Sequence, residues 1–206
     1  MALILFDFDG VLADTLGDLL QFGQEACDEL GVKHVATPDD LDVLEIMSFA
    51  EYGRQLGVPE SLVDEFVRRC LMRFAEKDSP PAIFHELDAV IRELCHSHTL
   101  AIVSGNTAAN VRDFLASHGL DGCFRGIFGV DSAGTKSQKI AQARGQWAKR
   151  GEAVFMVGDS VSDIRAAREA SVKSIAVEWG HQSPAKLLSA QPDYFVRSPK
   201  ELLEIP

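Results

Sequence analysis

Residues 3–15 read Leu-Ile-Leu-Phe-Asp-Phe-Asp-Gly-Val-Leu-Ala-Asp-Thr, an apolar run that ends in two carboxylates and a glycine. Short apolar runs bounded by turn residues are typical of buried strands, and a strand places residues i and i+2 on the same face. Asp7 and Asp9 are therefore expected side by side at the carboxyl end of a first strand, where ligands bind in open α/β sheets. Two adjacent carboxylates repel each other and need a cation or a shared proton to coexist. A strand that ends in a polar turn would explain Asp9-Gly10 alone, but not the second carboxylate.

Composition limits the class of protein to which the chain belongs. Its 206 residues, 46% hydrophobic and 25% charged, suit one large globular domain or a core with an insertion. The formal net charge of −11 argues against a nucleic-acid partner, because nonspecific binding to phosphate needs basic patches. No apolar stretch is long enough to cross a membrane, so no membrane partner is expected.

Two further features predict a cytoplasmic protein. The first strand begins almost at Met1, which leaves no room for a signal peptide. Cys27, Cys70, Cys95 and Cys123 are widely separated with no C-x-x-C pair, which favours free thiols in a reducing compartment.

The pattern of apolar residues predicts a fold of the α/β class. Strands are expected at residues 3–6, 99–103, 126–130, 154–157, 174–177 and 194–196, with helical spacing between most of them. Strands that alternate with helices indicate a doubly wound parallel sheet covered on both faces.

One long segment interrupts this alternation. Residues 15–80 show only helical spacing, with apolar stripes that include Leu16, Leu20 and Cys27, and later Phe66 and Cys70. The proline pair at 80–81 stops the run because proline lacks an amide donor. We therefore expect a small all-helical cap at 15–80, inserted after the first strand of a core formed by 1–14 and 81–206.

The second predicted strand ends in Ser104-Gly105-Asn106-Thr107, directly before a helix. A helix N-terminus offers free N–H groups and a partial positive charge, which suit a phosphate. The alternative is that Asn106 or Thr107 only caps its helix. Taken alone, this segment does not decide between the two.

Lys136 stands in the first turn of another predicted helix, where a positive charge opposes the helix dipole. This mismatch suggests that the lysine faces an anion or a carboxylate. Lys139, one turn further on, is the rival candidate, and a solvated lysine is the ordinary alternative for either position.

Gly158-Asp159-Ser160-Val161-Ser162-Asp163 follows a further predicted strand. Asp163 alone is explained as an acid favoured by the helix dipole. Carboxylates at the ends of two parallel strands are also what Mg²⁺ requires. All four polar segments fall at the carboxyl ends of strands or at the helix starts just beyond them, so a shared Mg²⁺ and phosphate site explains them better than four independent causes.

These motifs resemble those of the haloacid dehalogenase superfamily, and the resemblance covers essentially the whole chain. The pattern 7–11 looks like its first motif, Ser104 its second, Lys136 its third, and residues 158–163 its fourth. The helical insertion is similar to the cap of the phosphoglycolate phosphatase and β-phosphoglucomutase branch. The tail segments 175–181, 192–194 and 201–203 also look like the phosphoglycolate phosphatase group. Ser137 departs from the third motif, which often has proline or glycine after its lysine, so the choice of Lys136 over Lys139 depends on register.

The resemblance implies a Mg²⁺-dependent phosphatase of a small phosphorylated metabolite. Asp7 would be the nucleophile that forms an aspartyl-phosphate, and Asp9 the general acid and base. Mg²⁺ would be held by the Asp7 carboxylate, the Asp9 carbonyl and Asp159, with Asp163 bound directly or through water. Ser104, Gly105, Asn106 and Lys136 would bind the phosphoryl oxygens.

Other functions remain open at this stage. A phosphomutase similar to β-phosphoglucomutase shares these motifs, and a phospho-receiver or a non-catalytic scaffold would be a regulatory alternative. A dehalogenase is disfavoured by Asp9, and a phosphonate hydrolase would need a cap lysine such as Lys33 or Lys77. Tyr52 and Arg54 are candidate anion-facing cap residues, although an ordinary surface position is the safer expectation for both. The sequence is compatible with a monomer or a homodimer.

Overall fold

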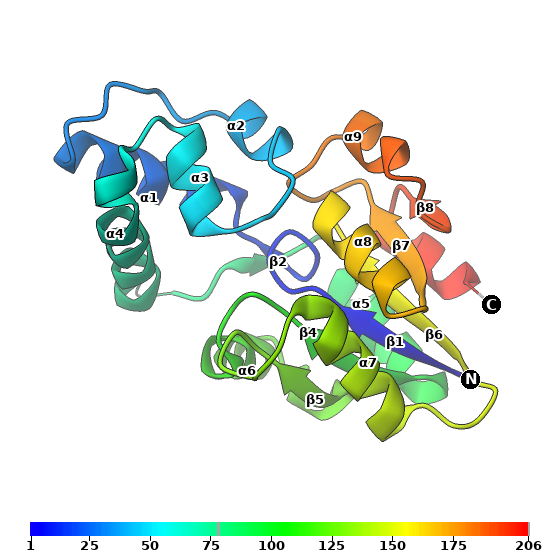
Figure 1. Cartoon of the computed structure of the whole chain (residues 1–206). Helices are drawn as coiled ribbons and strands as arrows, with labels where there is room; N and C mark the ends of the chain where they lie inside the picture. Colours follow the sequence, from blue (N-terminus) through cyan, green and yellow to red (C-terminus); the bar gives the residue numbers. More distant parts are fainter. Residues whose placement is uncertain (78, 206) are drawn as a thin grey trace. The chain divides into compact units, whose positions relative to one another are not determined.

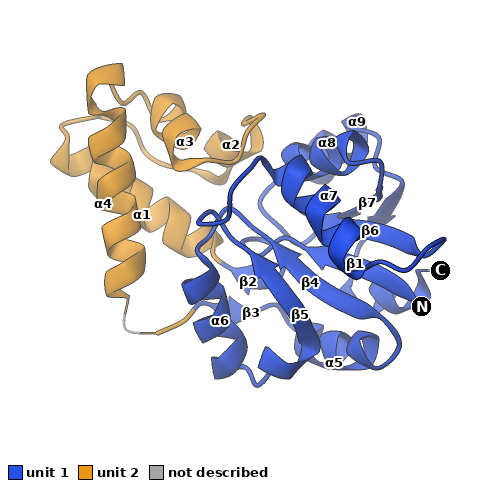
Figure 2. Cartoon of the chain, turned by 60° about the horizontal axis from the view of Figure 1, so that its bottom comes forward, with its two compact units in different colours: residues 1–14, 81–206 blue, residues 15–80 orange. Residues whose placement is uncertain are grey.

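The computed structural model describes residues 1–77 and 79–205. These residues divide into two compact units (Figure 2). One unit contains residues 1–14 and 81–206, and the other contains residues 15–80. The chain passes from the first unit to the second and returns once.

The larger unit is built on a six-stranded parallel sheet with the order β5-β4-β1-β6-β7-β8 (Figure 1). The strands are β1 (Ala2–Phe6), β4 (Thr99–Val103), β5 (Phe124–Phe128), β6 (Ala153–Gly158), β7 (Lys173–Val177) and β8 (Tyr194–Val196). The chain winds outward from β1 on one side, then crosses back to β6 on the other, so the expected doubly wound sheet is confirmed. The change of direction between β1 and β6 is the point at which such sheets bind ligands.

Helices cover both faces of this sheet. They are α5 (Leu87–Ser97), α6 (Ala108–Ser117), α7 (Lys136–Trp147), α8 (Val161–Glu169) and α9 (Pro184–Ser189), with short 3-10 turns η2 (Asp121–Cys123) and η3 (Pro199–Glu204). Alternate residues of β1 show how the two layers form, since Ile4 packs in the same buried cluster as α5 and α6. Leu5 points the other way and packs with α7 and α8. Both faces of β1 are therefore buried, which explains why the strand is apolar along its whole length.

The predicted strand 126–130 is wrong at both ends by two residues, because β5 runs from Phe124 to Phe128. The strand stops at Phe128, whose carbonyl accepts the Ser104 N–H at 2.9 Å. Beyond it the chain turns toward the second motif, since Val130 donates its N–H to the Asn106 carbonyl at 2.8 Å. The sequence missed the first two residues of β5 because this edge strand is only partly buried and therefore lacks a clear apolar pattern.

The smaller unit contains helices α1 (Leu16–Glu29), α2 (Pro38–Asp42), α3 (Phe49–Gln55) and α4 (Val63–Glu76), and the turn η1 (Glu60–Leu62). They enclose an apolar core of their own, to which Cys27, Phe66 and Cys70 contribute. The chain enters through β2 (Ala13–Asp14) and returns through β3 (Ala82–Ile83), which pair antiparallel within the larger unit. Among the described residues, no helix has the length and apolarity needed to cross a membrane.

Candidate active site

Asp7 and Asp159 extend two neighbouring strands. Asp7 follows β1 and donates its backbone N–H to the carbonyl of Val157 in β6 at 2.9 Å, so the ladder continues into the site. Asp159 follows the last residue of β6 and is 2% exposed. The parallel register therefore places both carboxylates at the sheet edge where the winding changes direction.

Lys136 joins two of the acids. A capping box between Thr135 and Gln138 starts α7 at Lys136. Its Nζ lies 2.7 Å from Asp7 Oδ2 and also forms an ion pair with Asp163 Oδ1. The unfavourable position of this lysine in the helix dipole is thus offset by two carboxylates, which are the anionic neighbours that the mismatch indicated.

Asp163 is held in place by its own helix start. Ser160 caps α8, accepts the Asp163 N–H, and donates its hydroxyl to Asp163 Oδ2 at 2.6 Å. The Ser160 N–H donates to the same oxygen at 3.2 Å. One carboxylate oxygen thus closes the capping box while the other faces Lys136, so Asp163 both caps its helix and joins the acid cluster.

Electrostatics in this cluster are dominated by burial. Burial raises the pKa of Asp7 to about 8, Asp163 and Asp159 add to the rise, and Lys136 opposes it. For Lys136 burial alone would lower the pKa, but the carboxylates of Asp163 and Asp7 raise it. The lysine is therefore a fixed positive charge, and Asp7 is the acid whose ionisation depends most on further positive charge.

The cluster has the chemistry of a site for a hard divalent cation. Carboxylate oxygens of Asp7, Asp159 and Asp163 lie within 4.8 Å of one another. The three carboxylates share one ammonium in a buried setting, so ionising all of them would leave excess negative charge. Mg²⁺ prefers oxygen ligands and is usually bound by one or two carboxylates together with water and substrate oxygens. These residues fit such an ion.

Asp9 has a different neighbour. Its Oδ2 accepts a hydrogen bond from Asn106 Nδ2 at 3.2 Å, across 97 residues of sequence. Gly10 follows with φ +75°, in the left-handed region, and its N–H bonds the Ala13 carbonyl at 2.9 Å. A Cβ at Gly10 would lie 2.0 Å from Asp159 Oδ2, so glycine is required here by both backbone angle and space.

The second motif forms a tight loop after β4. The Ser104 hydroxyl is buried and accepts the Asn106 N–H at 2.9 Å, while Asn106 Oδ1 accepts the Thr107 N–H at 2.8 Å. Thr107 caps α6 by accepting the Asn110 N–H. Gly105 is exposed and has open space where a side chain would stand. Capping is therefore done by Thr107, which leaves the Asn106 side chain to link this loop to Asp9.

Lys139 points elsewhere. It is 6% exposed, and its Nζ donates to the Gly129 carbonyl at 2.6 Å. Burial lowers the pKa of this lysine. Of the two rival lysines, the structure places Lys136 against the acids and Lys139 under the loop that follows β5.

His181 is a neighbour that the motifs did not reveal. Its backbone N–H donates to Asp159 Oδ2 at 2.8 Å and its Nδ1 lies 3.1 Å from the same oxygen. Burial alone would raise the pKa of Asp159, but the contact with His181 outweighs it and the pKa is lowered. Burial alone would lower the pKa of His181, but the contact with Asp159 outweighs it and the pKa is raised. In the sequence the only signal of His181 is a position shortly after the predicted strand 174–177. The close approach depends on Gly180, where a Cβ would lie 2.2 Å from the Asp159 Cβ.

With this geometry established, comparison with known proteins decides the family. Residues 4–177 match the family model for haloacid dehalogenase-like hydrolases. The chain belongs to this family. The resemblance carried by the four motifs is thereby confirmed.

Similar haloacid dehalogenase-like proteins include two curated phosphoglycolate phosphatases. One, from Synechococcus elongatus, is 28% identical over 216 residues, covering 99% of this chain and 96% of that protein. Another, from Agrobacterium fabrum, is 29% identical over 208 residues, covering 94% and 87%. A solved haloacid dehalogenase-like family hydrolase from Streptococcus pneumoniae shares the fold, with a TM-score of 0.88, 24% identity, and coverage of 99% and 97%.

Two residues of the smaller unit were candidates to face an anion, and the structure gives both of them other partners. Tyr52 is 1% exposed and its ring packs edge-on to Phe66, with centroids 6.1 Å apart. It is therefore a core residue, and the expectation of a surface or anion-facing position is wrong. Arg54 forms ion pairs with Glu51 at 2.7 Å and Glu60 at 2.6 Å on the surface of its own unit.

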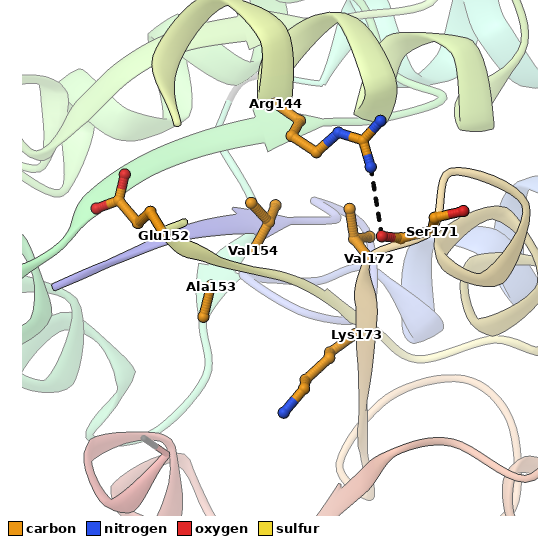
Figure 3. Close-up of a pocket in the computed structure, with 7 residues that line it drawn as sticks. All are labelled: Arg144, Glu152, Ala153, Val154, Ser171, Val172 and Lys173. Carbon is orange, nitrogen blue, oxygen red and sulfur yellow. Dashed lines mark hydrogen bonds between the residues drawn. The ribbon is translucent and has the colours of Figure 1, made fainter. Parts of the chain in front are cut away.

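A hollow of about 400 Å³ lies at the other end of the sheet (Figure 3). It is lined by Arg144, Glu152, Ala153, Val154, Ser171, Val172 and Lys173, which surround the starts of β6 and β7. Arg144 donates to the backbone carbonyls of Ala170 and Ser171, so its guanidinium is used in packing. No predicted site residue lines this hollow.

Proposed function

We propose that this haloacid dehalogenase-like hydrolase is a Mg²⁺-dependent phosphatase that hydrolyses a small phosphate monoester through an aspartyl-phosphate on Asp7. The observation that carries the proposal is that the two carboxylates after β1 have different surroundings. Asp7 belongs to the acid cluster and pairs with Lys136, whereas Asp9 is not one of the three clustered acids and accepts a hydrogen bond from Asn106. Two nearby acids in unlike surroundings are suited to two different chemical tasks.

In the first step an Asp7 oxygen attacks phosphorus in line with the ester oxygen. The new bond is a phosphoryl–carboxylate bond, and the bond that breaks joins phosphorus to the leaving alcohol. Asp9 supplies the proton that this alcohol needs. In the second step water attacks phosphorus and gives its proton to Asp9. Phosphate then leaves and the Asp7 carboxylate is restored.

The charge of the transferring group has to be neutralised, because positioning and electrostatics supply most of phosphoryl-transfer catalysis. Lys136 brings a permanent ammonium within 2.7 Å of the attacking carboxylate. Ser104 and Gly105 lie at the same end of the sheet and would supply a hydroxyl and an N–H donor. Mg²⁺ held by Asp7, Asp159, Asp163 and the Asp9 carbonyl would add positive charge and keep Asp7 ionised despite its burial.

The curated relatives point to the size of the substrate. Both are phosphoglycolate phosphatases and are covered almost fully by this chain. We therefore propose a small phosphorylated carboxylate, phosphoglycolate first, as the substrate class. A phosphomutase shares the first step but passes the phosphoryl group back to its product.

The test is hydrolysis of an aryl phosphate and of a panel of small phosphorylated metabolites, with and without Mg²⁺. We expect activity that EDTA removes, that Mg²⁺ restores, and that Asp7→Asn abolishes. Asp113→Asn is the matched control, because Asp113 is an exposed carboxylate of α6 outside the acid cluster. Full activity in Asp7→Asn contradicts the nucleophile assignment, and indifference to EDTA contradicts the metal. Turnover that requires a sugar bisphosphate would identify a mutase instead.

A further inference from the structure

Two thiols that are far apart in sequence meet at the sheet edge opposite the acids. Cys95 lies near the end of α5, which precedes β4, and Cys123 ends η2, which precedes β5. Their Sγ atoms are 3.2 Å apart, across 28 residues of sequence. Both residues are half-buried. The sequence predicts only scattered free thiols, because the pairing arises from the fold.

The segments that carry these thiols are fixed against each other. Arg92, one turn before Cys95, donates to the carbonyls of His118 at 2.9 Å and Gly119 at 2.8 Å. The Cys123 N–H bonds the Leu120 carbonyl at 2.9 Å, which ties η2 to the same connection. The segments that carry the two thiols are therefore held beside each other by the Arg92 guanidinium and by backbone hydrogen bonds.

We propose that Cys95 and Cys123 form a reversible intramolecular disulfide. A disulfide joins its sulfurs at about 2.0 Å, so the present separation closes by about 1 Å. The oxidant is a small disulfide such as oxidised glutathione. The Cys95 thiolate attacks it and releases one glutathione thiolate. The Cys123 thiolate then attacks the Cys95 sulfur of the mixed disulfide and releases the second. Two protons leave, the protein is oxidised by two electrons, and glutathione disulfide is reduced to two thiols.

The surroundings of the pair determine its rate. Burial, together with the adjacent Cys95 thiol, raises the pKa of Cys123 to about 11. The resolving thiolate is therefore scarce at neutral pH, and closure becomes faster as pH rises, by up to about tenfold per unit. Cys27 and Cys70 provide an internal comparison, because they are 1% and 0% exposed and a dissolved disulfide does not reach them.

The experiment treats the full chain with oxidised glutathione at pH 7, 8 and 9. Free thiols are counted after denaturation, and the protein is mapped by mass spectrometry. We expect four thiols to fall to two, a loss of two hydrogens per molecule, and a crosslink between the peptides of Cys95 and Cys123. The melting temperature of the oxidised protein should rise by about 5–10 °C, because the bond closes a long loop. Dithiothreitol should reverse both changes.

Two variants complete the test. Cys95→Ser should show no internal crosslink and no rise in melting temperature, whereas Cys27→Ala should keep both. Any of three results would overturn the proposal: four remaining thiols in the wild-type protein, a crosslink between molecules, or separate glutathione adducts on both cysteines. The pair lies at the sheet edge away from Asp7, and every readout is independent of phosphatase activity.

Discussion

Replacing Lys136 by methionine removes the only positive charge that the described structure places between Asp7 and Asp163. The side chain keeps its length and apolar stem, so the change isolates the ammonium. Two carboxylates, 13% and 1% exposed, then face each other without a counter-charge. Breaking a buried ion pair from one side costs about 3–5 kcal/mol. Since the Lys136 side chain is 25% exposed, we expect a loss of about 2–4 kcal/mol in the free energy of unfolding.

Activity should fall more steeply than stability. A preorganised charge at the reacting oxygens is worth about 10²–10³ in kcat. The matched variant is Lys139→Met, which removes a buried ammonium from the same helix. That variant leaves the Gly129 carbonyl without its donor and should cost about 1–3 kcal/mol of stability. Its kcat should stay within a few-fold of wild type.

Urea unfolding measures the first quantity, and aryl phosphate hydrolysis with Mg²⁺ measures the second. The two variants should thus both unfold more easily but differ by at least tenfold in kcat. A larger loss of kcat in Lys139→Met than in Lys136→Met would refute the reasoning, since it would place the phosphate beside the other lysine. Equal stability of Lys136→Met and wild type would show that the ion pairs contribute nothing to folding.

Three further outcomes are expected. Burial raises the pKa of Asp40, but hydrogen bonds from its neighbours lower it to about 2, below the ~3.9 of an unfolded chain. Asp40 therefore contributes about 1–2 kcal/mol to the free energy of unfolding above about pH 4, and this contribution is lost as the pH falls toward 2. In urea unfolding, the stability of Asp40→Asn should approach that of wild type between pH 4 and 2. A difference that stays constant over this range would contradict the prediction. His181→Asn should weaken Mg²⁺ binding, measured by calorimetry, by about tenfold, because His181 orients Asp159; an unchanged Kd argues against it. Gly10→Ala should lower the melting temperature by several degrees, whereas Gly17→Ala, which has open space and an ordinary backbone, should not; equal effects would show that the left-handed turn is unimportant.

The sequence was sufficient for the sheet and for the edge at which its polar residues gather. Buried strands such as β1 are continuous apolar runs, and Asp7 and Asp159 follow two of them directly. Lys136 was recognised by a local conflict with the helix dipole, which the structure resolves with two carboxylates. These features depend on short-range patterns, so periodicity and spacing reveal them.

Other features depend on contacts that no local pattern encodes. The Asn106–Asp9 hydrogen bond spans 97 residues, and the approach of His181 to Asp159 requires the absence of a side chain at Gly180. The sequence favoured a surface or anion-facing position for Tyr52, but its ring is buried. Its burial depends on Gly23, where a Cβ would lie 2.6 Å from the ring. Packing of this kind is visible only in three dimensions.

The short ladder between β2 and β3 has a consequence for how this protein diversifies. Ala13 pairs with Ile83 and Asp14 with Ala82, so the two cut ends of the inserted segment are already stapled together. The length of chain between them does not affect the sheet, because the β2–β3 pairing fixes both ends of the insert and offsets the entropy of closing the loop. Evolution can therefore lengthen, shorten or exchange the insert as a cassette while the catalytic strands stay in register.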